Sequence, residues 1–430
     1  MARVIPICPA RPQSPKVEEL CYQISLLTPM FGGGVHAGKV DQSMPFRPTA
    51  IRGQLQFWWR ATIGAQFADA KTLLERHSEI WGNTGKASPV KIVVGNIQTE
   101  ILKPCAEYQR QADGRSRLVW DNSLKTAGIP YALFPFAGKP PIRGQNTPEE
   151  YPAEFLSGGS FTLRVACPQA LRGDVQTAIR AWVNFGGLGA RTRRGCGSIY
   201  CKDLAPTTIA EVQRLAEGLL TDPPHDVREW PTLGGSLLIG DENAMIDAWA
   251  SAAGALQRFR QGPGSARNPG QQGRPGRSRW QEPETVRHLT KKRLPVHQRM
   301  ENIPQDAFPR AELGLPIMFH FKDQRDGDPD DTTLYPYIGG NKCDRMASPL
   351  IIKALGLQNN KAVPIVLRLR TLPLQTVRLD IGGRPYDTGR LRGAPLAQYD
   401  KSPMNGTASG SALDAFINFV QDEDVWGILP

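Results

Sequence analysis

The order of the apolar segments in the first half of the chain constrains the fold most strongly. Four segments are short, rich in β-branched residues and bounded by turn residues, as strands are: 22–28, 90–98, 160–166 and 198–204. Two others place large apolar residues at helical spacing: 49–67 and 169–185. The resulting order, βαββαβ, predicts a ferredoxin-like split βαβ unit, which is also the frame of RNA-recognition modules.

The length of 430 residues suits about two domains. The first is expected to span 1–204, with an insertion rich in Gly and Pro at about 100–158. Residues 205–232 indicate a linker, and 233–430 a second ferredoxin-like domain whose strand count is incomplete. Its elements are strands at 235–240, 316–321 and 363–372 and helices at 241–259 and 411–421. The expected class is therefore α+β, two ferredoxin-like domains with insertions.

Positive charge is concentrated in one segment. Residues 255–299 hold eleven Lys and Arg against Glu282 and Glu284, and so carry most of the formal net charge of +11. A local cationic tract favours a polyanionic partner, nucleic acid before membrane, although a solubilising loop has the same composition. Because Gly, Pro and Arg dominate and aliphatic residues are scarce, we expect a basic, flexible insertion at about 260–310.

Cysteine usage and the termini indicate the compartment. The seven cysteines are scattered singly, with no C-x-x-C pair and no nearby paired histidines, so neither a zinc site nor a disulfide framework is predicted. Prolines occupy the N-terminal stretch where a signal peptide needs an apolar run, and no eighteen consecutive residues are apolar. We expect a cytoplasmic protein with reduced thiols, no metal, no cofactor and no membrane partner.

Two motifs resemble known binding sites but lack residues that those sites require. The stretch 33–40, "GGVHAGKV", resembles a phosphate-binding loop, but Val40 replaces its Ser or Thr, and Pro45 and Pro48 disfavour a helix starting at Lys39. The acidic stretch 326–331, "DGDPDD", lacks the Gly and Glu that a calcium loop requires. A nucleotide-hydrolysing enzyme is therefore disfavoured, and the acidic stretch is expected to be a solvated turn.

The segment 185–200, "FGGLGARTRRGCGSIY", is the strongest functional signal. Its glycines let the backbone approach a ligand and expose amides, while Arg191, Arg193 and Arg194 offer donors to phosphates. A helix C-cap and turn would explain about two of the glycines. The remaining glycines and the three arginines favour a polyanion.

The segment 31–60 is the second signal. Its loop carries His36, Lys39 and Asp41, and a helix follows with Arg52 in its first turn. Trp58 and Trp59 point about 100° apart on a helix, so one is expected in the core, and stacking on a base is the lesser alternative for the other. The expected RNA-binding residues are His36, Lys39, Arg47, Arg52, Arg60, Gly187, Gly189, Arg191, Arg193, Arg194 and Gly195.

Catalysis needs more groups than this loop shows. Asp41 is one carboxylate, and RNA cleavage normally requires a second carboxylate, histidine or lysine nearby. Lys39 and His36 are the available partners. We therefore expect no catalytic set, and keep an endoribonuclease using Asp41 or His36 as the alternative. A purely structural adaptor conflicts with the placement of the arginines.

Four stretches together resemble the RAMP proteins of CRISPR effector complexes: "ISLLTPMFGGG", "FRPTAIRGQLQFWWR", "EIWGNTG" and "GGLGARTRRGCGS". They are most similar to the first RAMP subunit of the type III-B (Cmr) complex. In the second half, "RAELGLPIMFHF" and "DRMASPLIIKAL" resemble that family's C-terminal domain. The Arg-rich tract at 260–299 has no counterpart in the resemblance.

The resemblance implies a function in antiviral defence. A chain of this kind would be a non-catalytic subunit of a ribonucleoprotein, near the 3′ side of the CRISPR RNA, helping to capture complementary target RNA. Its partners would be the CRISPR guide RNA, single-stranded target RNA and other RAMP subunits. In related backbone subunits an aspartate in a similar loop cuts target RNA, so the resemblance implies RNA contact for Asp41 and leaves a catalytic role open.

Overall fold

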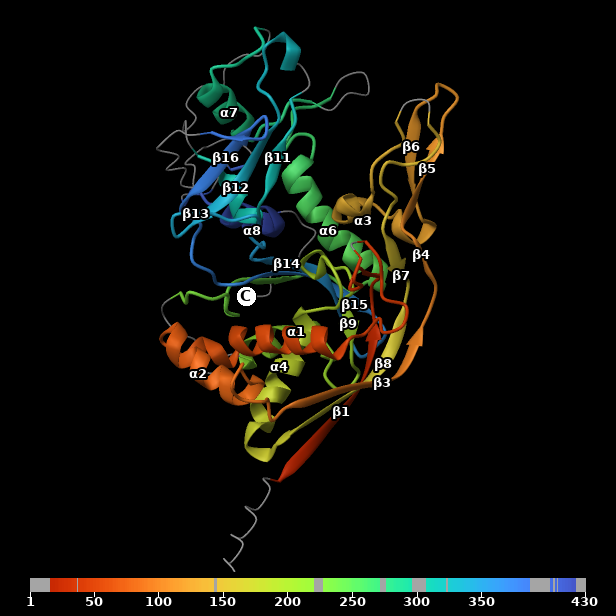
Figure 1. The fold of residues 1–430 in the computed structure, drawn as a ribbon, viewed down its shortest axis with the longest axis vertical. Coiled ribbons are helices and arrows are strands. Elements are labelled where there is room, and N and C mark those ends of the chain that lie inside the picture. The colour runs from red at the N-terminus through yellow and green to blue at the C-terminus, as the bar shows by residue number, and fades with distance from the viewer. Residues whose placement is uncertain are drawn as a thin grey trace, which may run out of the picture.

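The computed structural model describes residues 16–36, 38–142, 145–219, 227–270, 276–295, 307–321, 324–386 and 403–422 apart from 405, 406 and 408. The chain forms an elongated body in which a short central sheet lies between two groups of helices (Figure 1). The predicted α+β class with antiparallel sheets is confirmed.

A four-stranded antiparallel sheet forms the N-terminal part, in the order β3 (Lys91–Thr99), β8 (Gly159–Pro168), β1 (Val17–Leu26), β9 (Ile199–Tyr200). Helix α1 (Pro48–Ala61) follows β1 and helix α4 (Arg172–Phe185) follows β8. Along the chain these elements give the predicted order βαββαβ. The last strand is shorter than predicted, because it pairs with β1 at two positions.

Helix α1 begins at Pro48 and ends earlier than the sequence suggests. Proline suits the first turn because its missing N–H has no partner there in any case. At Thr62 the backbone leaves the helical region, and the hydroxyl donates to the Trp58 carbonyl at 2.7 Å. The predicted helix 49–67 is therefore α1 followed by a separate 3₁₀ turn, Ile63–Gln66.

Both tryptophans of α1 are core residues. Trp58 is 1% exposed and contacts Phe185, while Trp59 is 0% exposed and donates its indole N–H to the Asp174 carboxylate at 3.2 Å. Helix α2 (Ala70–Trp81), which the sequence analysis missed, packs beside α1. Because α1 is covered on more than one side, the expectation of a single core tryptophan is wrong, and neither ring is available to stack on a base.

The insertion between β3 and β8 has its own structure. A small sheet runs in the order β2 (Met30–Phe31), β7 (Glu154–Leu156), β4 (Leu102–Pro104). A hairpin of β5 (Ala106–Arg110) and β6 (Ser116–Trp120) and the short helix α3 (Ile129–Leu133) complete it. Helix α3 packs against α6 (Met245–Gln261) of the second half.

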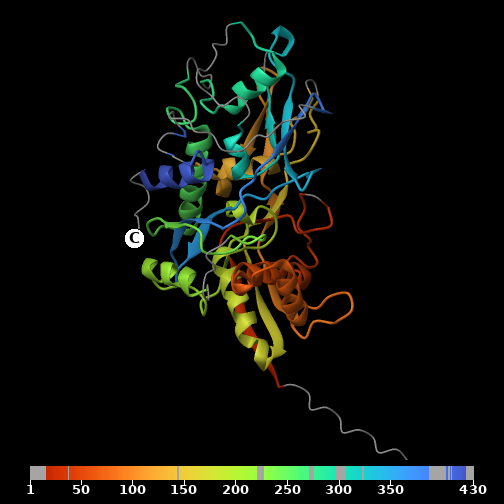
Figure 2. The ribbon, with the colours of Figure 1, turned by 90° about the vertical axis from the view of Figure 1, so that its left-hand side faces the viewer.

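The second half contains two sheets. The first runs in the order β10 (Leu237–Ile239), β15 (Ala362–Arg368), β14 (Leu350–Gly356), with α6 and α8 (Ala412–Asp422) packed side by side (Figure 2). The second contains β11 (Ile317–Phe319), β12 (Thr332–Ile338), β16 (Val377–Ile381) and β17 (Arg384–Pro385), with β13 (Asn341–Lys342) on β12. Two further helices are α5 (Ile209–Gly218) and α7 (Glu282–Thr290). In the described residues no fourth strand joins β10, so a complete second ferredoxin-like domain is not confirmed.

Strand β14 is buried on both faces. Ile351 and Leu355 enter the core of the N-terminal helices, whereas Leu350 and Ile352 enter the core formed with α6 and α8. Between them Lys353 is fully buried, and its ammonium donates to the Gly186 carbonyl at the end of α4 at 2.7 Å. One strand thus joins the two halves of the molecule. The division at 204 and 233 stays a prediction.

Burial lowers the pKa of Lys353 from 10.5 to about 7. Between these two pH values the unfolded chain binds more protons than the folded one, so the free energy of unfolding should rise with pH across this window. In Lys353→Met this rise should be smaller than in the wild type. Thermal unfolding at a series of pH values from 6.5 to about 10 measures it.

Lys91→Met, at an exposed lysine on β3, is the matched control and should keep the wild-type pH dependence. An equal rise in the wild type and in Lys353→Met would contradict the assigned protonation of the buried amine.

Candidate nucleic-acid interface

The two glycine-rich segments meet in space. The first loop, residues 32–47, leaves β2, and the second, the arginine–glycine loop at 186–198, joins α4 to β9. The Ala190 amide donates to the Phe31 carbonyl at 2.7 Å, and the Gly197 amide donates to the Pro29 carbonyl at 2.8 Å. Segments that lie about 150 residues apart in the sequence are therefore neighbours in the fold.

Packing explains more glycines of the arginine–glycine loop than a helix cap does. A Cβ on Gly195, whose φ is +83°, would lie 2.4 Å from the Trp249 ring. A Cβ on Gly187 would lie 2.7 Å from the Gly197 carbonyl oxygen. Gly189 is exposed and has a φ of +79°, and a Cβ there would lie 2.4 Å from the Phe31 oxygen. The estimate of about two structural glycines is too low, and only Gly189 of these three faces solvent.

The three arginines of this loop are tied to main-chain carbonyls. Arg191 Nε donates to Ala132 at 2.8 Å, and Arg193 donates to Ser348. Arg194 donates to Leu350 at 3.2 Å and to Leu313 at 3.3 Å. Burial lowers the pKa of all three, that of Arg194 to about 9, so they stay charged at neutral pH. They fasten the loop to the insertion and to the second half, and a phosphate would meet only their remaining N–H groups.

The first loop is more open. His36 and Lys39 are exposed, and the Lys39 ammonium lies 3.9 Å from Glu154 with 64% of its side chain accessible. No helix starts at Lys39, in agreement with the rejected phosphate-binding motif.

Asp41 organises its own turn. Its Oδ1 accepts from the Ser43 amide at 3.0 Å, the Ser43 hydroxyl at 2.7 Å and the Met44 amide at 3.2 Å. The Ser43 hydroxyl, followed by the Met44 amide, lowers the pKa of the carboxyl group. One oxygen of the only acid that the sequence analysis considered for catalysis is therefore committed to the loop.

The arginines of α1 fall into a separate group. Arg47 occupies the position before the first helical residue, and its side chain makes no capping hydrogen bond. Arg52 donates to the Val90 carbonyl at 2.9 Å, and Arg60 lies 3.3 Å from His77 Nε2. Burial, and then the charge of Arg60, lowers the pKa of His77 to about 4, so the imidazole is neutral and can accept this bond. Arg60 lies about 20 Å along the helix axis from Arg47, so the structure does not bring it to the first loop.

The basic tract is partly neutralised within the fold. Arg287 forms a buried bidentate pair with Asp328, at 3.0 and 3.1 Å. Arg277 and Arg293 both reach Glu284. Asp328 is 2% exposed, so the expectation of a fully solvated acidic turn at 326–331 is wrong. The flexibility of 260–310 stays a prediction, and Arg274 and Arg299 lie outside the described residues.

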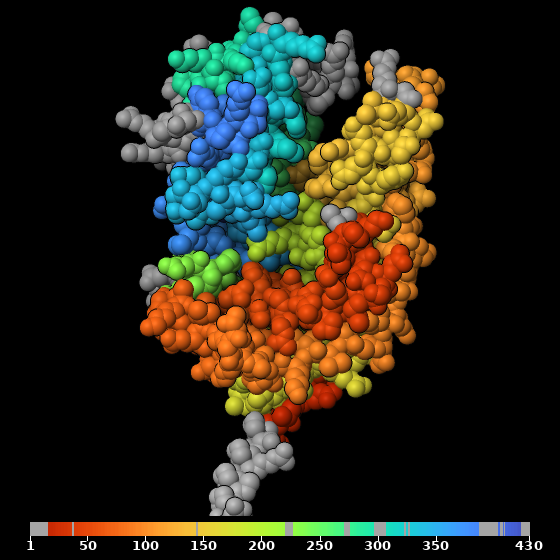
Figure 3. Space-filling view, viewed as in Figure 1, coloured from red at the N-terminus to blue at the C-terminus, as the bar shows by residue number. Residues whose placement is uncertain are grey.

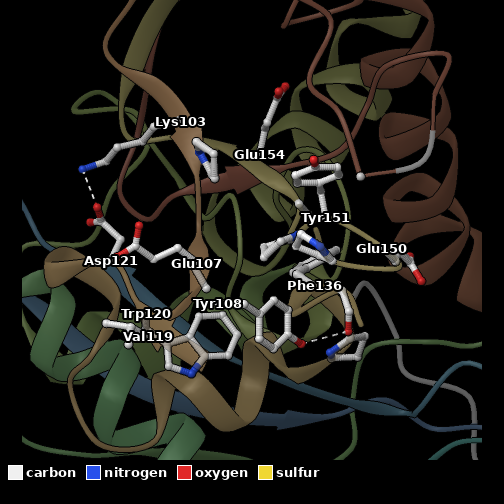
Figure 4. Close-up of a pocket in the computed structure, with 18 of the residues that line it drawn as sticks. Lys103, Glu107, Tyr108, Val119, Trp120, Asp121, Phe136, Glu150, Tyr151 and Glu154 are labelled. Carbon is white, nitrogen blue, oxygen red and sulfur yellow. Dashed lines mark hydrogen bonds and ion pairs between the residues drawn. The ribbon is translucent and has the colours of Figure 1, made fainter. Parts of the chain in front are cut away.

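A feature that the sequence analysis missed is a cavity of 1460 Å³ in the insertion (Figure 4). Its lining includes the aromatic residues Tyr108, Trp120, Phe136 and Tyr151. Lys103 pairs with Asp121 at 2.7 Å across one wall. The segment "YALFPFAG" was the available signal, but strands β4 to β7 that shape the cavity come from dispersed residues.

The described residues also bear on the expectations about metal ligands, membrane-spanning helices and cysteines. Among the described residues no three His, Cys, Asp or Glu side chains cluster as metal ligands would. None of the helices in the described ranges has the length and apolarity needed to cross a bilayer. The six cysteines within those ranges are free.

The chain is similar to known proteins, over less than half of its length for a curated relative and over most of its length for solved structures. A curated relative, the CRISPR system Cmr subunit Cmr1-2 of Pyrococcus furiosus, is 24% identical over 192 residues, which is 42% of this chain and 94% of the relative. The crystal structure of apo Cmr1 from Pyrococcus furiosus is 16% identical, with a TM-score of 0.44 over 82% of this chain and 88% of that chain.

A chain of the cryo-EM structure of type III-B Cmr-β bound to cognate target RNA is 10% identical, with a TM-score of 0.46 over 86% of this chain and 97% of that chain. Residues 23–200 match the model of the RAMP superfamily. This range contains the first loop, the insertion and the arginine–glycine loop. The similarity of this chain to the RAMP superfamily is therefore carried by residues 23–200.

Proposed function

We propose that this protein is an RNA-binding, non-catalytic subunit of a type III-B CRISPR effector complex. The observation that carries the proposal is the junction of the first loop with the arginine–glycine loop, within the RAMP segment. The junction joins the loop that carries exposed His36 and Lys39 to the loop that carries Gly189 and Arg191. A surface of open backbone and cationic side chains suits a phosphate backbone.

Similarity supports the choice of complex. The Pyrococcus furiosus relative is named a Cmr subunit, and it aligns along nearly its whole length. We propose the partners accordingly: CRISPR guide RNA, single-stranded target RNA and other RAMP subunits, with this chain near the 3′ side of the guide. The formal charge of +11 favours polyanionic partners of this kind.

We further propose that the two halves share the same ferredoxin-like fold. When α7 and the second sheet are set aside, the second half has the order β10, α6, β14, β15, α8. Its sheet order places the third of these strands between the other two, as in the N-terminal sheet. We keep the division into 1–204, a linker at 205–232 and 233–430 for this reason.

The non-catalytic part of the proposal rests on Asp41. Its oxygen is used by Ser43 and Met44 of the same turn, as an acceptor that stabilises the loop. The alternative, an endoribonuclease of the RAMP superfamily that acts on CRISPR or target RNA, needs this carboxylate or His36 to reach the scissile phosphate.

The RNA contact of the first loop can be measured through its salt dependence. Lys39→Gln should flatten the slope of log K against log salt by about 0.7 for single-stranded RNA, the value for one lost phosphate contact. Binding isotherms from 50 to 300 mM salt on the purified chain give the slope. Lys91→Gln on β3 is the charge-matched control and should leave it unchanged.

Equal slopes for Lys39→Gln, Lys91→Gln and the wild type would remove the first loop from the interface. The three arginines of the second loop are less suitable probes, because they also hold the fold together.

RNA integrity separates the two functional classes. End-labelled RNA incubated with the wild-type chain should stay intact with Mg²⁺ and with EDTA, because the loop carboxylate is engaged in its turn. Cleavage that disappears in Asp41→Asn or His36→Ala, with RNA binding retained, would instead establish the endoribonuclease.

A further inference from the structure

The surface is hollowed between the C-terminal elements and the insertion (Figure 3). In this view cyan and blue elements form one wall, the yellow and orange insertion forms the other, and lime-coloured chain around residue 190 lies between them. Helices α3 and α6 pack together behind it (Figure 1). Residues of both halves therefore face one recess.

Two polar side chains, one on α3 and one on α6, lack hydrogen-bond partners among the described residues. The hydroxyl of Tyr131, on α3, is buried and has no hydrogen-bond partner in the described structure. Arg260 is half-buried in the last turn of α6, where its carbonyl accepts from the Trp280 indole at 3.1 Å. No ion pair or hydrogen bond engages its guanidinium within the described ranges. Buried donors of this kind normally have an acceptor.

Three more arginines share this environment. Arg191 and Arg194 come from the arginine–glycine loop, and Arg310 from the 3₁₀ turn Pro309–Leu313, whose last carbonyl Arg194 contacts at 3.3 Å. Burial is the main cause of the lowered pKa of each guanidinium, and the charge of Arg260 lowers it further at all three. Arg260 thus acts on residues of two further elements, the arginine–glycine loop and the turn Pro309–Leu313. Trp280 links it to the second of these, because the Trp280 indole donates to the Arg260 carbonyl and Arg310 stacks on the same ring.

The described residues supply little negative charge here. Glu282 lies 3.2 Å from Arg310, whereas neither Arg191 nor Arg194 forms an ion pair with a carboxylate of the described residues. Like charges repel more strongly where water is scarce. Four guanidinium groups offset by one acid therefore favour an anion beside them.

We propose that Tyr131, Arg191, Arg194, Arg260 and Arg310 form a phosphate-binding site, the inter-half arginine site, for the backbone of an RNA strand. Guanidinium groups bind phosphate oxygens through paired N–H donors, and the tyrosine hydroxyl adds a neutral donor. Trp280, on which Arg310 stacks at 5.4 Å, fixes the wall of the site. This inference rests on the proposed RNA-binding function and adds the second half of the chain to the interface.

The first test uses inorganic phosphate alone. The wild-type chain should show a higher Tm in phosphate than in chloride of equal ionic strength, because a ligand that binds the folded state stabilises it. Arg260→Gln and Tyr131→Phe should lose much of this increment. Neither removes a contact present in the free protein, so both are expected to fold. Arg115→Gln at the tip of the β5–β6 hairpin, 87% exposed, is the charge-matched control.

The second test uses single-stranded RNA across a salt series. Arg260→Gln should weaken RNA binding about tenfold, because it removes a hydrogen bond from a charged donor. Tyr131→Phe should weaken RNA binding about fivefold, because it removes a hydrogen bond from a neutral donor. Arg260→Gln should also flatten the salt slope by about 0.7, and Arg115→Gln should match the wild type.

The outcomes separate the two proposals. A wild-type chain that binds no RNA would overturn the proposed function. RNA binding by the wild type with unchanged affinity and slope in both Arg260→Gln and Tyr131→Phe would overturn the inter-half arginine site alone. A phosphate increment that these variants lose, with RNA affinity unaffected, would assign the site to free phosphate and also overturn the RNA assignment.

Discussion

Strand β14 carries side chains into two cores at once, and the position of the arginine–glycine loop depends on it. Ile351 and Leu355 pack with the N-terminal helices, and Leu350 and Ile352 pack with α6 and α8. Lys353 reaches from this strand to the end of α4, and Arg194 returns from the loop to Leu350. The loop is thus held at both edges by a strand that lies about 150 residues further along the chain.

The sequence predicts helices that bury one face and misses strand β14, which is buried on both. Helix α4 shows its apolar spacing because its other side meets water. Strand β14, "LIIKALG", has no alternation to detect, since every residue is buried. The pair Trp58 and Trp59 fails for a related reason: the 100° angle between them predicts one buried ring, but α2 covers the side that the sequence leaves open. Long-range coverage of this kind is not encoded in local periodicity.

The segments that form the candidate site could be predicted from the sequence, but the contacts of their charged side chains could not. Both glycine-rich segments could be found from composition, and nothing local indicated that Ala190 would pair with Phe31. Charge counting overstated the free cations, because Arg193, Arg194 and Arg287 are used by carbonyls or buried carboxylates. In contrast, Arg260 belonged to a tract that looked like a single basic loop, and its environment depends on α3, which no pattern placed beside it.

The carbonyl bonds of Arg191, Arg193 and Arg194 have an entropic consequence. A free surface arginine gives up rotamer freedom when it binds, at about 0.5–1.5 kcal/mol for each immobilised side chain. Here folding has already fixed the three guanidinium groups, so that loss does not fall on association. An anion that binds these groups therefore meets a pre-ordered surface. Because less entropy is lost on binding, the complex should be longer-lived than one formed by free surface arginines.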